Sequence, residues 1–196
     1  MLALPKNSVR LGGVTERADG VWAGVGLGLD AGRFLVTASG TRGQLTPTGA
    51  GVAPTRDVGQ LAVSARYEVR SWLGLDLGYD ARAFSSAAGY QRWNIAVLGA
   101  TASRDLGISA VRGFASLAYL PVLSVTNQQR PTFGLGSDVG LSLAPNRFPL
   151  SFLLSYRIQR FSFPAAAARS EQFEALTFSV GVRARRRPGG WTLRGS

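Results

Sequence analysis

The feature that most constrains this chain is a two-residue alternation of apolar and non-apolar side chains that recurs along its length. In the segment 21–30 one parity is apolar, and the other holds only Trp22, glycines and Asp30. Leu73, Leu75, Leu77 and Tyr79 alternate in the same way with glycine and aspartate. Because successive side chains of a β-strand point to opposite faces, this pattern predicts strands with one apolar face each.

Ten such segments are found, near residues 8–16, 21–30, 33–43, 57–70, 72–84, 91–104, 107–120, 133–144, 149–162 and 171–185. The connections between them alternate in length. Those at 31–32, 71, 105–106 and 145–148 are tight, whereas 44–56, 85–90, 121–132 and 163–170 are longer. The first connection, near 18–20, is short although it falls on the side of the longer loops. This organisation predicts consecutive antiparallel hairpins within one domain.

The non-apolar face is small or ionic, with many Gly, Ala and Ser residues and isolated Arg and Asp residues. Glycine is poor on a solvent-exposed strand but suits the crowded inside of a closed barrel. At ~3.3 Å per residue and a tilt of ~40°, ten residues span the roughly 25 Å apolar band of a membrane barrel. The apolar face is therefore predicted to meet lipid; a soluble β-barrel or sandwich is the competing interpretation.

Aromatic residues gather near the segment ends, which predicts two girdles at the membrane interfaces. Those beside tight connections are Phe34, Trp72 and Phe148; those beside longer loops are Phe84, Tyr90, Trp93, Tyr119, Phe133, Phe161 and Phe163.

With this pattern, residues 8–185 resemble bacterial outer-membrane β-barrel proteins as a class. The resemblance implies an all-β, antiparallel up-and-down transmembrane barrel of about ten strands, with eight as the alternative count. It also implies location in a bacterial outer membrane, with one barrel domain at 1–185 and a basic, glycine-containing tail at 186–196. The chain departs from the class where its last segment runs into Arg183–Arg187 instead of closing on an aromatic residue. From Met1 onward, neither a signal peptide nor a run of about 18 apolar residues is found.

Composition removes most enzyme classes. The chain has no Cys and no His, so thiolate metal sites, Cys nucleophiles and Ser–His triads are all excluded. We therefore predict no enzymatic activity, no cofactor and no metal. The 22 Lys and Arg residues outnumber the 11 Asp and Glu residues, giving a net charge of +11. These basic residues are spread singly apart from Arg185–Arg187, which argues against nucleic acid as a partner.

The candidate functional residues are charged side chains predicted to face the lumen. The principal set is Arg66, Glu68, Asp76, Asp80, Arg82, Arg112, Asp138, Arg157 and Arg183, with Arg10, Asp30, Arg33 and Arg70 as further inward candidates. Hairpin register predicts that Asp30 faces Arg33, that Arg66 faces Asp76 and that Asp138 lies diagonal to Arg157. Glycines of the same parity would leave room for long Arg side chains. Two interpretations stay open: a salt-bridge lattice that fills the lumen, or a narrow aqueous path whose arginines favour anions.

The leading functional prediction is a non-enzymatic outer-membrane barrel with a structural or surface-interaction role. Its contact surfaces would be the loops 44–56 and 121–132, which are open to a protein partner. The first alternative is a porin-like, anion-preferring pore, and the second is a lipid-modifying enzyme of the outer leaflet. The lipid bilayer is the expected surrounding. Lipopolysaccharide phosphates are candidate ligands for basic residues at the longer loops, namely Arg42, Arg56, Arg92, Arg130 and Arg169.

Overall fold

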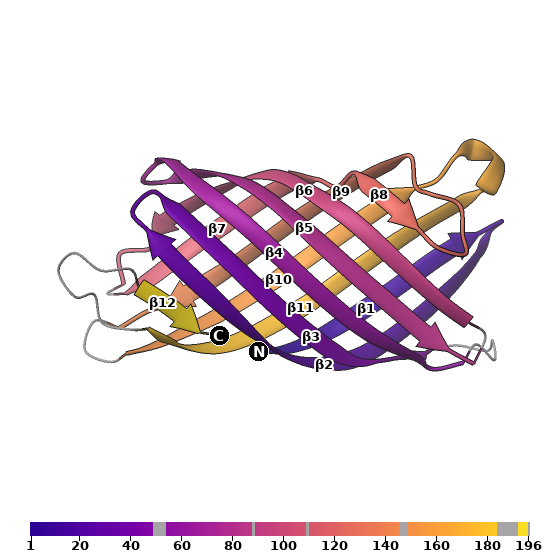
Figure 1. Ribbon diagram of the computed structural model, residues 1–196, viewed down its shortest axis with the longest axis horizontal. Coiled ribbons are helices and arrows are strands. Elements are labelled where there is room, and N and C mark those ends of the chain that lie inside the picture. The colour runs from indigo at the N-terminus through magenta and orange to yellow at the C-terminus, as the bar shows by residue number, and fades with distance from the viewer. Residues whose placement is uncertain (49–53, 88, 109, 146–148, 184–191, 196) are drawn as a thin grey trace.

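The computed structural model is a closed antiparallel β-barrel, and it describes residues 1–48, 54–87, 89–108, 110–145, 149–183 and 192–195 (Figure 1). Ten strands form the wall: β1 (Leu2–Leu11), β2 (Val14–Ala31), β3 (Phe34–Pro47), β4 (Arg56–Arg70), β5 (Leu73–Ser86), β6 (Gly89–Asp105), β7 (Val111–Tyr119), β9 (Phe133–Leu143), β10 (Leu150–Ser162) and β11 (Arg169–Arg183). Each wall strand pairs with its neighbours in chain order, and β1 closes the ring by pairing with both β2 and β11. The prediction of a ten-stranded up-and-down barrel is thus confirmed.

Two short strands supplement this wall. β8 (Val122–Val125) pairs with β6, and β12 (Thr192–Gly195) pairs with both β2 and β11. β12 lies beside residues 27–30 of β2, whereas β1 lies beside residues 14–23, so the two follow one another in the same position of the wall. Four residues of the predicted 186–196 tail therefore form part of the barrel wall. The Met1 ammonium group donates to the Gly24 carbonyl at 3.1 Å, within that same position.

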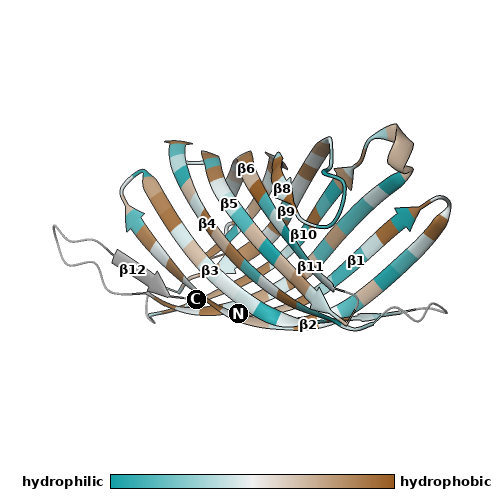
Figure 2. Cartoon of the chain, turned by 45° about the vertical axis from the view of Figure 1, so that its right-hand side comes forward, coloured by the Kyte–Doolittle hydropathy of each residue, from teal (hydrophilic) through white to brown (hydrophobic). Residues whose placement is uncertain are grey.

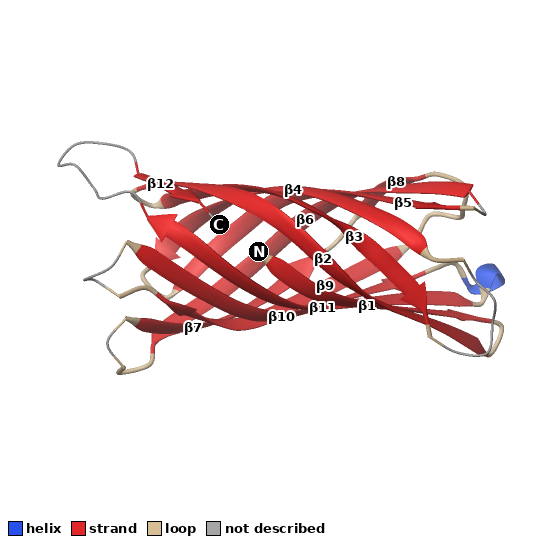
Figure 3. Ribbon diagram, turned by 90° about the horizontal axis from the view of Figure 1, so that it is seen from below, coloured by secondary structure: helices blue, strands red, loops and turns tan. Residues whose placement is uncertain are grey.

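The two ends of the barrel differ. The turn end holds the connections 32–33, 71–72, 106–110 and 144–149; the loop end holds 12–13, 48–55, 87–88, 120–132 and 163–168. Figures 1 and 3 show β12 near the turn end, and the 3-10 helix η1 (Ala165–Ala167) at the loop end. The long connection 120–132 is itself ordered by β8, whose Val125 pairs with Trp93.

The predicted boundaries of the first hairpin are wrong. The turn is at Gly12–Gly13, with φ angles of 54° and 92° that glycine adopts at little cost. Gly20, which was expected to mark the connection, lies inside β2 instead. A Cβ there would lie 1.9 Å from the Gln44 carbonyl oxygen, so this glycine permits close strand approach rather than a turn.

The outer surface carries an apolar belt in the half of the barrel nearer the turn end. Val25, Leu27, Leu61, Leu75 and Leu77 are exposed there, as sequence parity predicts. The belt is formed by the outward side chains of residues 21–29, 34–38, 61–69, 73–83, 96–102, 113–119, 133–143, 150–158 and 176–182, together with Leu2 and Leu4. Figure 2 shows hydrophobic and hydrophilic residues alternating along these strands.

Nearer the loop end, the outward side chains of five strands are polar. We call this region the polar collar; it comprises the outward residues of 6–10, 15–19, 42–46, 160–162 and 170–174. The 18 residues of β2 would span ~45 Å at ~3.3 Å per residue and a tilt of ~40°, against an apolar band of roughly 25 Å. β2 is thus about 20 Å longer than the apolar belt requires.

Candidate functional site in the barrel interior

The interior beside the apolar belt is polar, and one hydrogen-bonded group there joins three strands. Asp76 of β5 lies opposite Arg66 of β4 in register and accepts a hydrogen bond from its Nε at 2.6 Å. Arg66 Nη2 donates to Thr101 Oγ1 of β6 at 2.8 Å, and that hydroxyl donates to Asp76 at 2.6 Å. The predicted Arg66–Asp76 pair is confirmed. Thr101 completes a closed ring of three hydrogen bonds.

Glycine makes room for this group. A Cβ at Gly74 would lie 2.9 Å from both Cγ and Cδ of Arg66, so any larger residue would displace the arginine side chain. Gly140 similarly leaves space for the Phe114 ring, whose Cζ would lie 2.7 Å from a Cβ at that position. The inward glycines at these positions are therefore packing partners of large side chains.

A second ion pair joins the inner faces of β9 and β10. Asp138 accepts hydrogen bonds from Nε and Nη2 of Arg157 at 3.1 and 2.9 Å. The two residues are direct register partners rather than diagonal ones. The Arg157 side chain is 46% exposed and that of Arg66 is 35% exposed, although both face inward. Both guanidinium groups are therefore accessible to solvent within the barrel.

A more deeply buried polar layer lies nearer the loop end. The Arg82 and Asp80 side chains are only 4% and 5% exposed, and Arg82 Nη2 donates to Asp80 Oδ2 at 2.5 Å. Gln60 donates to the same carboxylate oxygen at 2.8 Å. Arg82 also donates to the side chain of Gln159, which lies 77 positions later in the chain. The Arg82 guanidinium carbon lies 4.6 Å from the Phe173 ring centroid. This layer links β4, β5, β10 and β11 across the interior.

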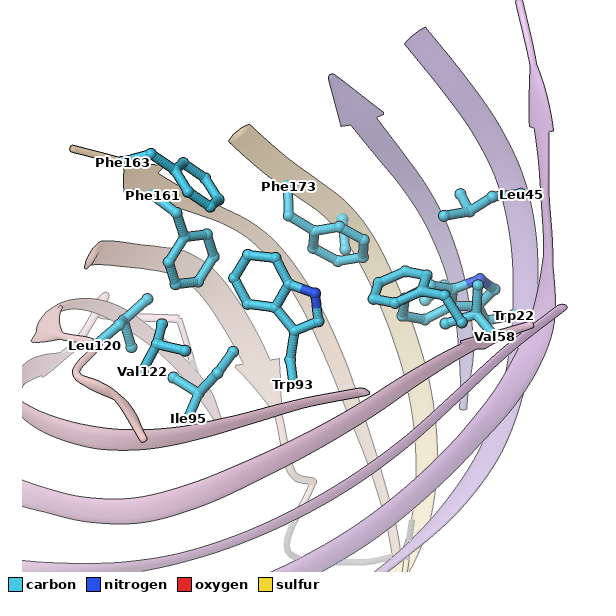
Figure 4. Close-up of a cluster of buried hydrophobic side chains, with 13 residues drawn as sticks. Trp22, Leu45, Val58, Trp93, Ile95, Leu120, Val122, Phe161, Phe163 and Phe173 are labelled. Carbon is cyan, nitrogen blue, oxygen red and sulfur yellow. The ribbon is translucent and has the colours of Figure 1, made fainter. Parts of the chain in front are cut away.

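Large apolar side chains fill the interior beyond this layer. This apolar cluster consists of Ala3, Trp22, Leu45, Val58, Phe84, Trp93, Ile95, Leu120, Val122, Phe161, Phe163, Phe173 and Ala175, all of them buried. Figure 4 shows its side chains projecting from the curved wall toward one another. Ring centroids of Trp93 and Phe161 lie 5.1 Å apart, and those of Trp22 and Phe173 lie 5.2 Å apart. A packed apolar cluster therefore lies inside the loop end of the barrel.

The cluster and the polar collar occupy the same level of the wall. Leu45 lies between outward Gln44 and Thr46, and Phe173 lies between outward Gln172 and Glu174. In the apolar belt the arrangement is reversed, since inward Asp76 lies between outward Leu75 and Leu77. On the five strands of the polar collar the inside is apolar and the outside polar, as in a soluble protein, whereas the apolar belt has the reverse arrangement, which is typical of a membrane barrel.

The other residues predicted to line the lumen are not members of these interior groups. Glu68 is exposed near the turn end, and Arg112 pairs with Asp105 at 3.1 Å at that same end, where both side chains are well exposed. Arg183 ends β11, but its side chain lies outside the described residues. The inward prediction for Arg10 is wrong, because its register partner Ser170 and the parity of Leu2 and Leu4 place it on the outer surface.

The predicted Asp30–Arg33 register is also wrong. Asp30 pairs with Leu35, while Arg33 belongs to the two-residue turn with Gly32, whose φ angle is 68°. A two-residue turn spanning residues 32–33 shifts the opposite position by two residues relative to the expected hairpin.

The aromatic girdle prediction fails at the loop end for four residues. Phe84, Trp93, Phe161 and Phe163 belong to the buried interior cluster. Tyr90, Tyr119 and Phe133 are exposed, as are Phe34 and Trp72 toward the turn end, while Phe148 lies outside the described residues. Strand parity was the available signal: these four positions alternate with outward polar residues such as Arg92, Asn94, Arg160 and Ser162.

Two arginines expected at the loop surface also point inward. Arg169 pairs with Glu171, and its guanidinium carbon lies 5.0 Å from the Phe163 ring centroid. Arg56 has the inward parity of Val58. Arg42, Arg92 and Arg130 are exposed, and Arg130 Nη1 donates to the Leu123 carbonyl at 3.4 Å.

Within the described residues, no group of three or more His, Cys, Asp or Glu side chains lies close enough to hold a metal ion. None of the helical segments in that part of the chain has the length and apolar character needed to span a membrane. The interior offers instead paired charges, amide groups and a packed aromatic end.

Among solved structures, the chain is similar to the translocator domain of the autotransporter NalP from Neisseria meningitidis. The two are 12% identical, the match covers 99% of this chain and 84% of that chain, and the TM-score is 0.45. No protein-family model and no curated protein sequence matches the chain.

Proposed function

We propose that this protein is a closed, non-enzymatic barrel of the bacterial outer membrane that presents a rigid loop end for surface contacts. The observation that carries this proposal is the apolar cluster, which packs large side chains from around the wall across the interior. A packed apolar interior excludes water and ions, because a dry constriction offers permeating ions no compensation for lost hydration. The apolar belt supports placement in a bilayer.

One of the two predicted contact loops, at 121–132, is held to the barrel by strand pairing and by a side-chain hydrogen bond. The connection 120–132 is fixed by β8 and by Asn127, whose side chain donates to the Tyr90 carbonyl at 2.5 Å. Leu120 and Val122 face the interior cluster, while Leu123, Ser124 and Thr126 are exposed. In the second contact loop, predicted at 44–56, residues 44–47 end β3 and Arg56 begins β4, while residues 49–53 lie outside the described residues. Contacts made by such a surface would cost little ordering entropy.

An anion-preferring pore is the second candidate, and one observation favours it. Arg66 and Arg157 are solvent-accessible within the polar half of the interior, so anions entering from the turn end would meet positive charge. The two candidates differ in one respect, namely whether the apolar cluster blocks passage to the loop end.

Planar-bilayer conductance of the refolded full chain under a KCl gradient tests this difference, after heat-shifted gel mobility has verified folding. We expect the wild-type barrel to insert without conducting. The double variant Trp93→Ala/Phe161→Ala removes two contacting rings from the cluster and should conduct, with a reversal potential that favours chloride. Phe34→Ala, which removes an exposed ring from the outer surface, is the matched control and should remain silent.

Discrete chloride-selective steps in the wild-type barrel would refute the closed barrel and establish the pore. A silent double variant that is fully folded would show that the cluster does not close the interior.

For the contact role, replacing residues 123–129 by Gly and Ser should leave folding and the absence of conductance unchanged. It should abolish retention of the refolded barrel on intact bacterial cells; unchanged retention would exclude this loop as the contact surface.

A further inference from the structure

On the outer wall, basic side chains gather where the polar collar meets the apolar belt across β10, β11, β1 and β2. Cross-strand register places Arg160, Gln172, Ser8 and Arg17 in one row around the barrel. Arg10 lies in the next row toward the loop end, and Lys6 lies in the next row toward the turn end. At ~4.8 Å between strands, the row from Arg160 to Arg17 covers about 14 Å.

Two acidic residues, Glu174 and Asp19, lie beside this strip, and the first is already engaged. Glu174 lies opposite Lys6 and accepts hydrogen bonds from the Tyr156 hydroxyl and the Gln172 amide. Asp19 lies opposite Lys6 on its other side. Within the described part of the chain, no salt bridge holds Arg10, Arg17 or Arg160; Arg160 donates through Nε to Gln172 at 2.6 Å, with its other nitrogens still available. The strip therefore presents three guanidinium groups outward.

The position of this strip relative to the apolar belt identifies its ligand. The row just beyond Lys6 and Glu174 consists of Leu4, Leu176 and Tyr156, all of them exposed. Lys6 lies two residues beyond this row, or about 5 Å of height along a tilted strand, and the row from Arg160 to Arg17 lies four residues beyond it, or about 10 Å. A lipid whose acyl chains contact Leu4 and Leu176 would consequently hold its headgroup at the level of the arginines.

We propose that this strip, formed by Lys6, Arg10, Arg17 and Arg160, binds the phosphate groups of lipopolysaccharide in the outer leaflet. Guanidinium groups bind phosphate through paired, charge-assisted hydrogen bonds, and the Gln172 and Ser8 side chains between them suit a polar sugar. The proposal rests on the outer-membrane placement proposed above. It assigns the ligand to the outer wall, whereas Arg56 and Arg169, candidates from the sequence, face inward.

The test measures binding of phosphorylated lipid A to the refolded full chain in uncharged detergent micelles. Arg17→Gln/Arg160→Gln removes two charges from the strip, and we expect affinity to fall about thirty-fold, since each basic residue near a lipid surface contributes ~1 kcal/mol. Arg70→Gln/Arg104→Gln is the matched control, because it removes the same charge from exposed residues of the opposite end. That control should bind like the wild type, and dephosphorylated lipid A should bind weakly to all three proteins.

An equal loss of lipid A affinity in the two double variants would mean that net charge alone determines binding, and it would overturn the assigned site. Tight binding of dephosphorylated lipid A would show that acyl contacts alone account for lipid binding. Competition by millimolar inorganic phosphate would indicate that the strip is a site for free phosphate. Failure of lipid binding in a folded, silent barrel would refute this inference alone. Conductance in the wild type, in contrast, would refute the closed barrel without affecting the lipid measurement.

Discussion

Asp80→Ala should be among the most destabilising single substitutions in the barrel interior. It removes the carboxylate that accepts hydrogen bonds from Gln60 and Arg82, and it leaves an arginine that is 4% exposed without its direct ion-pair partner. Breaking a buried ion pair in this way costs about 3–5 kcal/mol. Gln159 and the Phe173 ring still contact Arg82, which places the expected loss near 3 kcal/mol.

Two further variants test whether the loss of stability comes from an unpaired buried charge or from lost packing. Asp138→Ala removes the partner of Arg157, whose side chain is 46% exposed and can be hydrated, so we expect a loss of about 1 kcal/mol or less. Asp80→Ala/Arg82→Leu removes both charges and should recover most of the loss seen in the single variant.

The assay is equilibrium unfolding of the refolded barrel in urea, followed by tryptophan fluorescence, because Trp22 and Trp93 lie in the adjacent apolar cluster. Equal midpoints for Asp80→Ala and Asp138→Ala would refute the reasoning, since burial would then not determine the cost. A double variant no more stable than Asp80→Ala would refute it as well, because the unpaired arginine would not be the source of the loss.

Three other substitutions test the packing and the membrane placement by the same unfolding measurement. Gly74→Ala places a Cβ 2.9 Å from the Arg66 side chain and should cost about 1–3 kcal/mol, and an unchanged midpoint would mean that Arg66 moves aside freely. Gly13→Ala, with no atom within 4 Å of the new Cβ but a φ of 92°, should cost about 1 kcal/mol through backbone strain alone; a loss as large as that of a core truncation would contradict this. Leu77→Arg, on the apolar belt, should destabilise the barrel in lipid vesicles by about 2–4 kcal/mol, whereas Thr46→Arg in the polar collar should be nearly neutral; similar losses at both positions would argue against lipid contact at the belt alone.

Much of the architecture could be predicted from alternation alone. A two-residue period assigns each side chain to a face, and hairpin turns then place neighbours in the chain side by side. The strand count and the Arg66–Asp76 pair followed from this local information, and both are present in the structure. The first hairpin was misplaced because glycine serves both turns and close strand approach, and the sequence does not distinguish Gly12 from Gly20.

The interior could be predicted only in part. Parity identifies Trp93 and Phe161 as inward residues, but an aromatic residue near a strand end is equally typical of a membrane interface. Contacts such as Arg82 with Gln159, which are 77 positions apart, depend on strands that meet only after the sheet has curled and closed.

By itself, the sequence determined most of the strands and the face that most of their side chains take, because alternation repeats every two residues along a single strand. Only the tertiary structure decided which faces pack against each other across the barrel. Closure places Trp22, Trp93 and Phe173 in one buried cluster and puts Arg160 and Arg17 in one row across the β11–β1 junction. The physical reason is that packing and charge pairing depend on distances between strands far apart in the chain, and these distances are set by closure of the sheet rather than by any local pattern.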